Sequence, residues 1–163
     1  MSEQVTPHVI TRIVSGGQTG VDRVALDVAM QLGLPHGGWC PRGRRAEDGP
    51  IPARYALRET RSPAYKVRTE RNVLDSDGTL IICRGPLRGG TLLTRRLAAQ
   101  HARPCRSVDL AGTHCAREVA DWVRRERIAV LNVAGPREST APGIGLQAKT
   151  FLAEMLQQLI AGN

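Results

Sequence analysis

Apolar residues follow two patterns along this chain: short continuous runs, and longer stretches in which they recur every three or four positions. A short continuous run is typical of a strand that is buried on both faces. Five segments are either short apolar runs or short extended stretches, and we expect them to be strands. They are residues 9–14, 34–39, 79–83, 105–110 and 128–133.

The stretches with helical spacing lie between these runs. From Val21 the apolar positions mark one face of a helix, and Gly33 is placed to end it. Further helices are predicted over 52–60, from a Thr69 cap to about 76, over 91–100, from a Thr113 cap to about 125, and at the C-terminal end. Alternating strands and helices predict one α/β domain over 1–163, with a doubly wound, mainly parallel sheet of five or more strands and helices on both faces.

Three of the predicted strands run into loops that contain glycine. The first, 15–23, has three glycines in five positions and precedes a helix. Glycine lets the backbone come close to a ligand, and a helix start offers unpaired N–H groups and a positive dipole end. The sequence therefore predicts a phosphate or oxyanion site, with a tight turn that binds nothing as the alternative. The second loop, 84–91, and the third, 134–143, should converge with it, since ligands of doubly wound sheets bind at the carboxyl ends of the strands.

The segment 38–49 is rich in glycine, proline and charge, so we expect neither helix nor strand there. It carries Trp39 and the arginines Arg42, Arg44 and Arg45. Arginine forks match the geometry of phosphate and carboxylate, which favours a loop with a binding function. A solvated basic loop is the alternative.

Composition narrows the choice of partner. The formal net charge is +8, and all but Lys66 and Lys149 of the 23 basic residues are arginines spread along the chain. Aromatic residues make up only 3%, which leaves few platforms for stacked bases. The charge therefore favours an anionic small molecule over nucleic acid. No apolar run could span a bilayer, and the segment 1–7 lacks a signal-peptide core, so we expect no membrane contact and a cytoplasmic protein.

The cysteines and histidines give no sign of a metal site. Cys40, Cys83, Cys105 and Cys115 lie far apart without a Cys-x-x-Cys pair, and the four histidines are equally scattered. Cysteines of this kind in a cytosolic chain are expected to be small buried apolar residues.

Several motifs together resemble the molybdenum cofactor carrier family. They are Ser-Gly-Gly-Gln-Thr-Gly-Val-Asp-Arg at 15–23, Gly-Trp-Cys-Pro at 38–41 with Arg44 and Ala-Glu-Asp-Gly at 46–49, Thr-Glu at 69–70 with Asn-Val at 72–73, Asp-Ser-Asp-Gly-Thr at 75–79, Gly-Gly-Thr at 89–91 and Asn-Val-Ala-Gly-Pro-Arg-Glu-Ser at 132–139. The resemblance implies a Rossmann-like fold of the group that includes lysine-decarboxylase-like and cytokinin-activating proteins. It also implies a homo-oligomer, a dimer or tetramer, that binds molybdenum cofactor, a pterin bearing a phosphate and an oxo-metal group.

The same resemblance assigns roles to residues of all three loops. The first loop would hold phosphate or an oxyanion, the second would form another anion-binding turn, the third would line a further side, and Arg42, with Arg44, would close over the ligand. The residues so implied are Gly16, Gly17, Gln18, Thr19, Gly20, Arg42, Gly89, Gly90, Thr91, Asn132, Arg137, Glu138 and Ser139.

The competing function is hydrolysis of a nucleotide derivative. In the cytokinin-activating phosphoribohydrolases the second loop reads Pro-Gly-Gly-x-Gly-Thr, followed by a glutamate that does the acid chemistry. Here no carboxylate follows Gly-Gly-Thr, and a general acid or base must lie within hydrogen-bond reach of the substrate. We therefore expect a carrier and not an enzyme. Asp22, Glu47, Asp48 and Glu138 are the carboxylates that could replace the missing glutamate.

Overall fold

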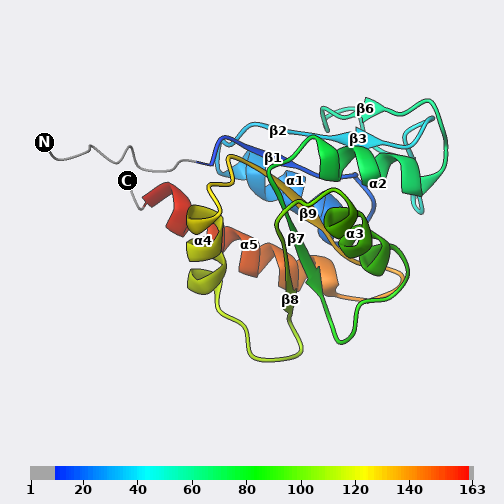
Figure 1. Ribbon diagram of the computed structural model, residues 1–163. Helices are drawn as coiled ribbons and strands as arrows, with labels where there is room; N and C mark the ends of the chain where they lie inside the picture. Colours follow the sequence, from blue (N-terminus) through cyan, green and yellow to red (C-terminus); the bar gives the residue numbers. More distant parts are fainter. Residues whose placement is uncertain (1–9, 162–163) are drawn as a thin grey trace, which may run out of the picture.

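The centre of the molecule is a sheet of five parallel strands, shown by a computed structural model that describes residues 10–161 (Figure 1). The strand order across the sheet is β2-β1-β9-β7-β8. This arrangement confirms the predicted parallel sheet of a Rossmann-like, doubly wound fold. The strands are β1 (Arg12–Val14), β2 (His36–Gly37), β7 (Gly78–Cys83), β8 (Cys105–Asp109) and β9 (Val130–Ala134).

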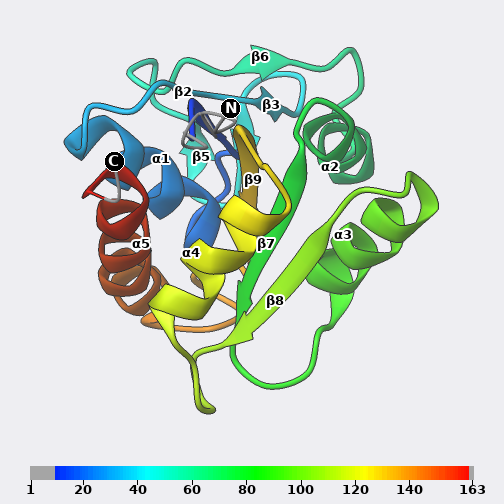
Figure 2. The same cartoon turned by 60° about the vertical axis from the view of Figure 1, so that its left-hand side comes forward.

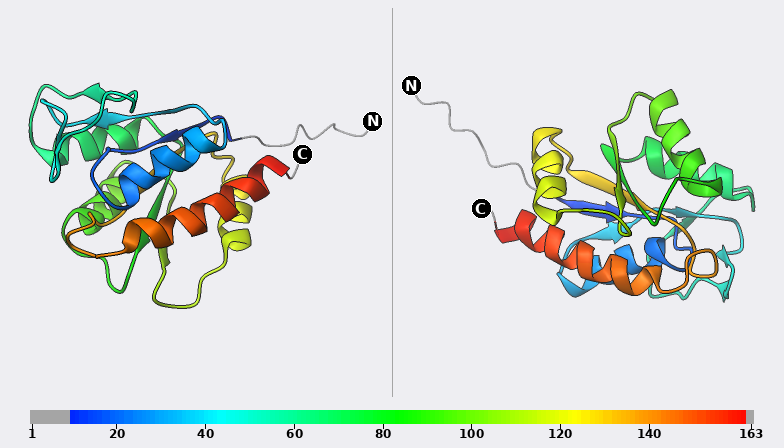
Figure 3. Two further views of the ribbon diagram at one scale, coloured as in Figure 1. Left: turned by 180° about the vertical axis from the view of Figure 1, so that it is seen from behind. Right: turned by 90° about the horizontal axis from the view of Figure 1, so that it is seen from below.

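Helices cover both faces of this sheet (Figures 2 and 3). On one face, α5 packs against both α1 and α4, and on the other face α2 packs against α3. The apolar stripes of α1, α4 and α5 face the sheet, as helical spacing requires, whereas the buried side of α2 carries Arg68, Asn72 and Val73. The helices are α1 (Val21–Gln31), α2 (Tyr65–Leu74), α3 (Gly89–Gln100), α4 (Ala116–Arg125) and α5 (Ile144–Ala161).

The main core lies between the sheet and the face formed by α1, α4 and α5. All six residues of β7 are buried, as expected of a strand covered on both faces. Leu131 of β9 and Leu152 and Met155 of α5 are completely inaccessible in the same cluster. Full burial of an aliphatic side chain of this size contributes roughly 1.5–3 kcal/mol. The long C-terminal helix is therefore a major part of what holds the sheet in place.

The order of the strands reverses between the two halves of the sheet. From β1 the chain moves outward to β2, crosses to β7 and β8, and enters last at β9, between β1 and β7. A Cβ on Gly135, just after β9, would lie 2.4 Å from the carbonyl oxygen of Ile82. Glycine is needed there because β9 leaves the sheet against β7. The carboxyl ends of β1, β9 and β7 thus meet at the reversal, where ligands bind in folds of this class.

The segment between β2 and α2 differs from the prediction. Residues 38–49 contain short strands, β3 (Trp39–Cys40), β4 (Arg45–Ala46) and β5 (Gly49–Pro50), so the expectation of no strand was wrong. The helix predicted over 52–60 is absent, and β6 (Arg58–Glu59) pairs there with β3. The guanidinium group of Arg44 explains much of this conformation. It donates hydrogen bonds to four backbone carbonyl oxygens, those of Ile51, Pro52, Tyr55 and Leu57.

Two helix starts also differ from the prediction. Helix α2 begins at Tyr65, and Thr69 does not cap it, because the Thr69 hydroxyl donates to the Tyr65 carbonyl oxygen within the helix. Helix α4 begins at Ala116 after a Cys115 cap, and not at Thr113. All four cysteines are free thiols; Cys40 and Cys83 are buried as expected, whereas Cys105 is half-buried and Cys115 is exposed.

Two predictions concern residues that lie outside the described range. Residue 9, the first of the predicted first strand, and the polar segment 1–7 both lie outside 10–161. Within 10–161, no helix has the length and apolar character needed to cross a membrane.

Candidate functional site

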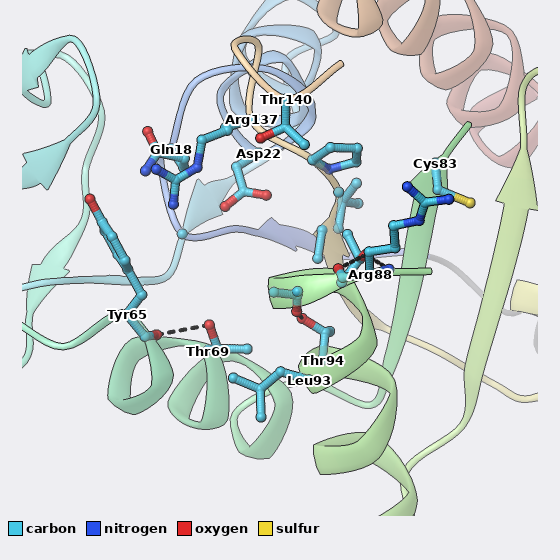
Figure 4. Close-up of a pocket in the computed structure, with 18 of the residues that line it drawn as sticks. Gln18, Asp22, Tyr65, Thr69, Cys83, Arg88, Leu93, Thr94, Arg137 and Thr140 are labelled. Atoms are coloured by element: carbon cyan, nitrogen blue, oxygen red, sulfur yellow. Dashed lines mark hydrogen bonds between the residues drawn. The ribbon is translucent and has the colours of Figure 1, made fainter. Parts of the chain in front are cut away.

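A cavity of about 640 Å³ opens at the carboxyl edge of the sheet (Figure 4). Its wall is formed by the β1–α1 loop, one face of α2, the β7–α3 loop with the first turns of α3, and the β9–α5 loop. The three glycine-bearing loops do converge, as the strand order requires. A cavity of this volume is in the range that holds a nucleotide-sized ligand.

The predicted binding residues divide into two groups. Gly16, Gln18, Gly89, Gly90, Thr91, Asn132 and Arg137 line the cavity, whereas Gly17, Thr19, Gly20, Arg42, Glu138 and Ser139 are not part of its lining. The first group is placed to touch a ligand directly. In the second group, the Gly17 carbonyl oxygen accepts from the Arg23 guanidinium, and a Cβ on Gly20 would lie 2.4 Å from the Pro136 carbonyl oxygen.

The start of α3 presents free donors to the cavity. The backbone N–H groups of Gly89 and Gly90 have no acceptor within the described part of the chain, and a Cβ built on either glycine meets no atom within 4 Å. Thr91 fixes this turn, because its hydroxyl accepts from the Arg88 N–H at 3.2 Å and donates to the Arg88 carbonyl oxygen at 2.7 Å. The positive dipole end of a twelve-residue helix therefore faces open space.

The first glycine loop is arranged differently, because the chain supplies its own anion there. The carboxyl group of Asp22, in the first turn of α1, is buried and points into the cavity (Figure 4). Burial raises the pKa of Asp22, although the Arg68 guanidinium and the backbone N–H groups of Gly135, Gln18 and Gly16 act to lower it. Some of the backbone N–H groups that the sequence predicts to hold a ligand oxyanion, those of Gly16 and Gln18, thus interact with the Asp22 carboxylate.

Arg68 comes from the opposite wall and pairs with this carboxylate. Its Nη1 lies 3.3 Å from Asp22 Oδ2, and both side chains are about nine-tenths buried. A Cβ on Gly16 would lie only 1.8 Å from Arg68 Nη1, so the absence of a side chain at position 16 makes room for the guanidinium group. The loop glycine therefore serves an internal ion pair.

Gln18 is held in one orientation. Its Oε1 accepts hydrogen bonds from the backbone N–H groups of Thr19, at 3.0 Å, and Glu47, at 2.9 Å. Its Nε2 must then point the other way, and this buried atom has no acceptor among residues 10–161. An unpaired buried donor is costly, but this atom has almost no accessible surface and so does not face the open cavity.

Glu47 ties the first and third loops together. Its carboxylate accepts hydrogen bonds from the hydroxyl groups of Thr19 and Ser139 and from the Ser139 N–H. These bonds lower the pKa of Glu47, with the side-chain bonds from Ser139 and Thr19 as the largest causes. Glu138 instead accepts from the N–H groups of Gly143 and Gly145, at the start of α5. Thr19, Ser139 and Glu138 thus shape the loops around the cavity.

Arg42 and Arg44, in the segment between β2 and α2, are not part of the cavity lining. Arg44 is committed to the four carbonyl oxygens described above, so it is not free to close over a ligand. Arg42 is exposed on the turn after β3, where its backbone N–H bonds to the Ser62 carbonyl oxygen.

The sequence prediction missed an entire wall of the cavity. Four residues of α2 line it: Tyr65, Arg68, Thr69 and Asn72. Their spacing of three, four and seven positions places them on one helical face, and a polar face on a helix that packs against α3 and β3 was the available signal. Arg137 of the third loop reaches the same wall, with its guanidinium carbon 5.3 Å from the centre of the Tyr65 ring.

A parallel sheet with a cavity at its carboxyl edge defines a Rossmann-like fold, with the cavity at the place where ligands bind in doubly wound sheets. The chain belongs to the circularly permutated YpsA SLOG family, whose sequence model matches residues 13–156. It is also similar to the crystal structure of a "putative molybdenum carrier protein" from Syntrophus aciditrophicus SB, with 47% sequence identity and a TM-score of 0.83. That similarity covers 90% of this chain and 94% of the other. A comparison with curated proteins gave no match.

Proposed function

We propose that this protein is a carrier that binds a phosphorylated small molecule, with molybdenum cofactor as the first candidate, and places its phosphate at the first turn of α3. The name of the similar Syntrophus protein supports a molybdenum compound as cargo. The observation that carries the proposal is the open start of α3, where the N–H groups of Gly89 and Gly90 face the cavity without acceptors.

The charges around the cavity suit such a ligand. Arg88 and Arg137 line it, and neither guanidinium has a carboxylate within 4 Å in the described part of the chain. Arginine forks bind phosphate and other oxyanions through paired N–H donors. Molybdenum cofactor carries both a phosphate and oxo groups, so these donors fit it. A single internal anion, Asp22, leaves the cavity with an excess of positive charge for the cargo.

Calorimetric titration with molybdenum cofactor, molybdate, tungstate, inorganic phosphate and nucleoside monophosphates tests this proposal. Binding of a phosphorylated ligand should be weakened at least about tenfold by Gly90→Ala, because a methyl group there would stand beside the free N–H groups. Gly112→Ala is the matched control, since the nearest atom to its Cβ is 3.8 Å away and it lies outside the cavity lining. Absence of binding to every ligand would refute the proposal, as would an equal effect of the two substitutions.

A second function, hydrolysis of a nucleotide derivative, rests on the position of Asp22. Its buried carboxyl group points into the cavity and has a raised pKa, as a general acid would need. Release of free base from nucleoside monophosphates, lost in Asp22→Asn, would favour this function. Glu138→Gln is the control, because Glu138 is not part of the cavity lining and its carboxylate accepts from the N–H groups of Gly143 and Gly145 at the start of α5. Inactivity on every nucleoside monophosphate would refute this second function and leave the carrier proposal standing.

A further inference from the structure

Arginine side chains gather around the Trp39 ring, on β3. The guanidinium carbons of Arg58, on β6, and Arg71, on α2, lie 5.9 and 4.6 Å from the centre of that ring. Both arginine residues are exposed. A guanidinium group at such a distance is attracted to the ring. The indole therefore holds two long basic side chains in place at the surface.

The Tyr65 ring, at the start of α2, is surrounded in the same way. The guanidinium carbon of Arg45 lies 4.9 Å from its centre, and those of Arg137 and Arg68 lie at 5.3 and 5.4 Å. Arg45 is exposed, whereas Arg68 is buried in its ion pair with Asp22. Because Tyr65 also lines the cavity, the exposed arginines on this side adjoin the ligand site.

Beta strands β3 and β6 and helix α2 lie together at one end of the molecule (Figures 1 and 2). Six exposed basic residues of these elements and their connections form what we call the basic face: Arg42, Arg45, Arg58, Arg61, Lys66 and Arg71. None of the six has a carboxylate oxygen within 4 Å among residues 10–161.

The carboxylates of the same region have other hydrogen-bond partners. Asp75 accepts from the indole N–H of Trp39 at 2.6 Å. Glu59 accepts from the backbone N–H of Gly43, also at 2.6 Å. The basic face therefore carries positive charge that the described part of the chain does not pair.

The arginines near α4 show that this is not the arrangement everywhere on the surface. There, Arg124 lies 3.1 Å from the carboxylate of Asp121, and Arg106 lies 3.8 Å from that of Glu118. Basic and acidic side chains alternate along α4, so an approaching anion meets both signs of charge there. On the basic face it meets guanidinium groups stacked on aromatic rings.

Stacking decides which kind of anion the basic face suits. A guanidinium group held against a ring can still bind a carboxylate through two parallel N–H donors at its edge. Less side-chain freedom is lost on binding when the group is already restricted. The same stacking works against single-stranded nucleic acid, because the ring faces on which bases would stack are already occupied.

We propose that the basic face is a docking surface for a protein partner that presents a cluster of carboxylate side chains. The partner's carboxylates bind the stacked guanidinium groups of Arg45, Arg58 and Arg71. Since Arg45 lies over the ring of a residue that lines the cavity, the bound partner lies next to the ligand site.

Fluorescence anisotropy of a labelled oligoglutamate peptide, at low ionic strength, tests this proposal on the full chain. Combined Arg58→Lys and Arg71→Lys substitutions keep the net charge but remove the planar forks, and should weaken binding about fivefold. The matched control combines Arg125→Lys and Arg127→Lys, an exposed pair at the end of α4, away from the basic face (Figure 1). The control should bind the peptide as the wild type does.

Several outcomes would overturn the proposal. Absence of oligoglutamate binding is one, and an equal effect of the two paired substitutions, or no effect of the first pair, is another, because net charge alone would then explain binding. Tighter binding of a single-stranded oligodeoxynucleotide of equal charge, weakened by the first pair, would assign the face to nucleic acid instead. None of the four substituted arginines lines the cavity, so phosphorylated ligands should bind both variants as they bind the wild type. Failure of ligand binding would thus refute the carrier and leave the docking surface untouched.

Discussion

Replacement of Gly16 by alanine gives a sharp test of how the first loop is built. The new Cβ would lie 1.8 Å from Arg68 Nη1 and 2.6 Å from its Cζ. Ordinary contact begins at 3.4 Å, so the guanidinium group must move away by about 1.6 Å. Its ion pair with Asp22, now 3.3 Å long, would not survive that shift. The substitution should therefore leave a buried carboxylate without its partner.

The expected cost follows from the burial of the pair. Loss of one partner of a buried ion pair destabilises a protein by about 3–5 kcal/mol. Because a displaced arginine can still reach water through the cavity, we expect about 3 kcal/mol, at the lower end of that range. Urea unfolding, followed by circular dichroism and evaluated at constant slope, measures the loss of unfolding free energy.

A double-mutant cycle separates the proposed clash from any other effect of the methyl group. In an Arg68→Met background the guanidinium group is gone, so Gly16→Ala should cost less than about 1 kcal/mol. The two single substitutions would then be strongly non-additive. Equal costs of Gly16→Ala in both backgrounds would refute the reasoning, because the methyl group would then be meeting something other than Arg68.

Three further predictions concern single side chains. The pKa of Asp22 is raised above 3.8 in the folded state, so its contribution to stability is present at pH values below 3.8 and is lost as the pH rises through the folded pKa. Urea unfolding of the wild type and of Asp22→Asn across pH 3.5–8 measures this loss. The wild type should lose unfolding free energy relative to the variant as the pH rises in that window. Tyr55→Phe removes a buried hydroxyl that donates to Asp27 at 2.6 Å, and should lower the unfolding free energy by about 1.5 kcal/mol in the same assay, whereas no change would contradict this bond. Arg44→Lys cannot keep four carbonyl bonds, so amide hydrogen exchange over 51–57 should become faster with exchange in β7 unchanged; uniform exchange across both would contradict the anchoring role.

Strand positions could be predicted because burial on both faces leaves a direct mark on the sequence. The run 79–83 is entirely apolar apart from Thr79, and it forms β7, an inner strand that pairs with β9 on one side and β8 on the other. The segment between β2 and α2 has no comparable apolar run that would have predicted its conformation. Its conformation depends on one arginine that bonds to carbonyl oxygens seven to thirteen residues away, and such long-range bonds have no periodic signature.

The loops of the candidate site, with Gln18, Thr91, Asn132 and Arg137 in or beside them, could be predicted from the sequence, whereas the contribution of α2 could not. Parallel strands bring their carboxyl ends to one edge, so the convergence of the glycine loops follows from topology alone. Which residues of α2 line the cavity depends on how that helix is rotated against its neighbours α3 and β3. Tyr65 and Arg68 therefore entered the site only through the structure, although their spacing already placed them on one face.

The position of Asp22 changes the meaning of the glycine-rich motif that begins at Ser15. A loop of this kind before a helix is commonly a cradle for phosphate, because its N–H groups have no other partner. Here an internal carboxylate lies among those N–H groups and is held by Arg68, for which Gly16 makes room. The first loop is therefore poorly suited to a second anion, and this is why we propose the open start of α3 as the place where a phosphate binds.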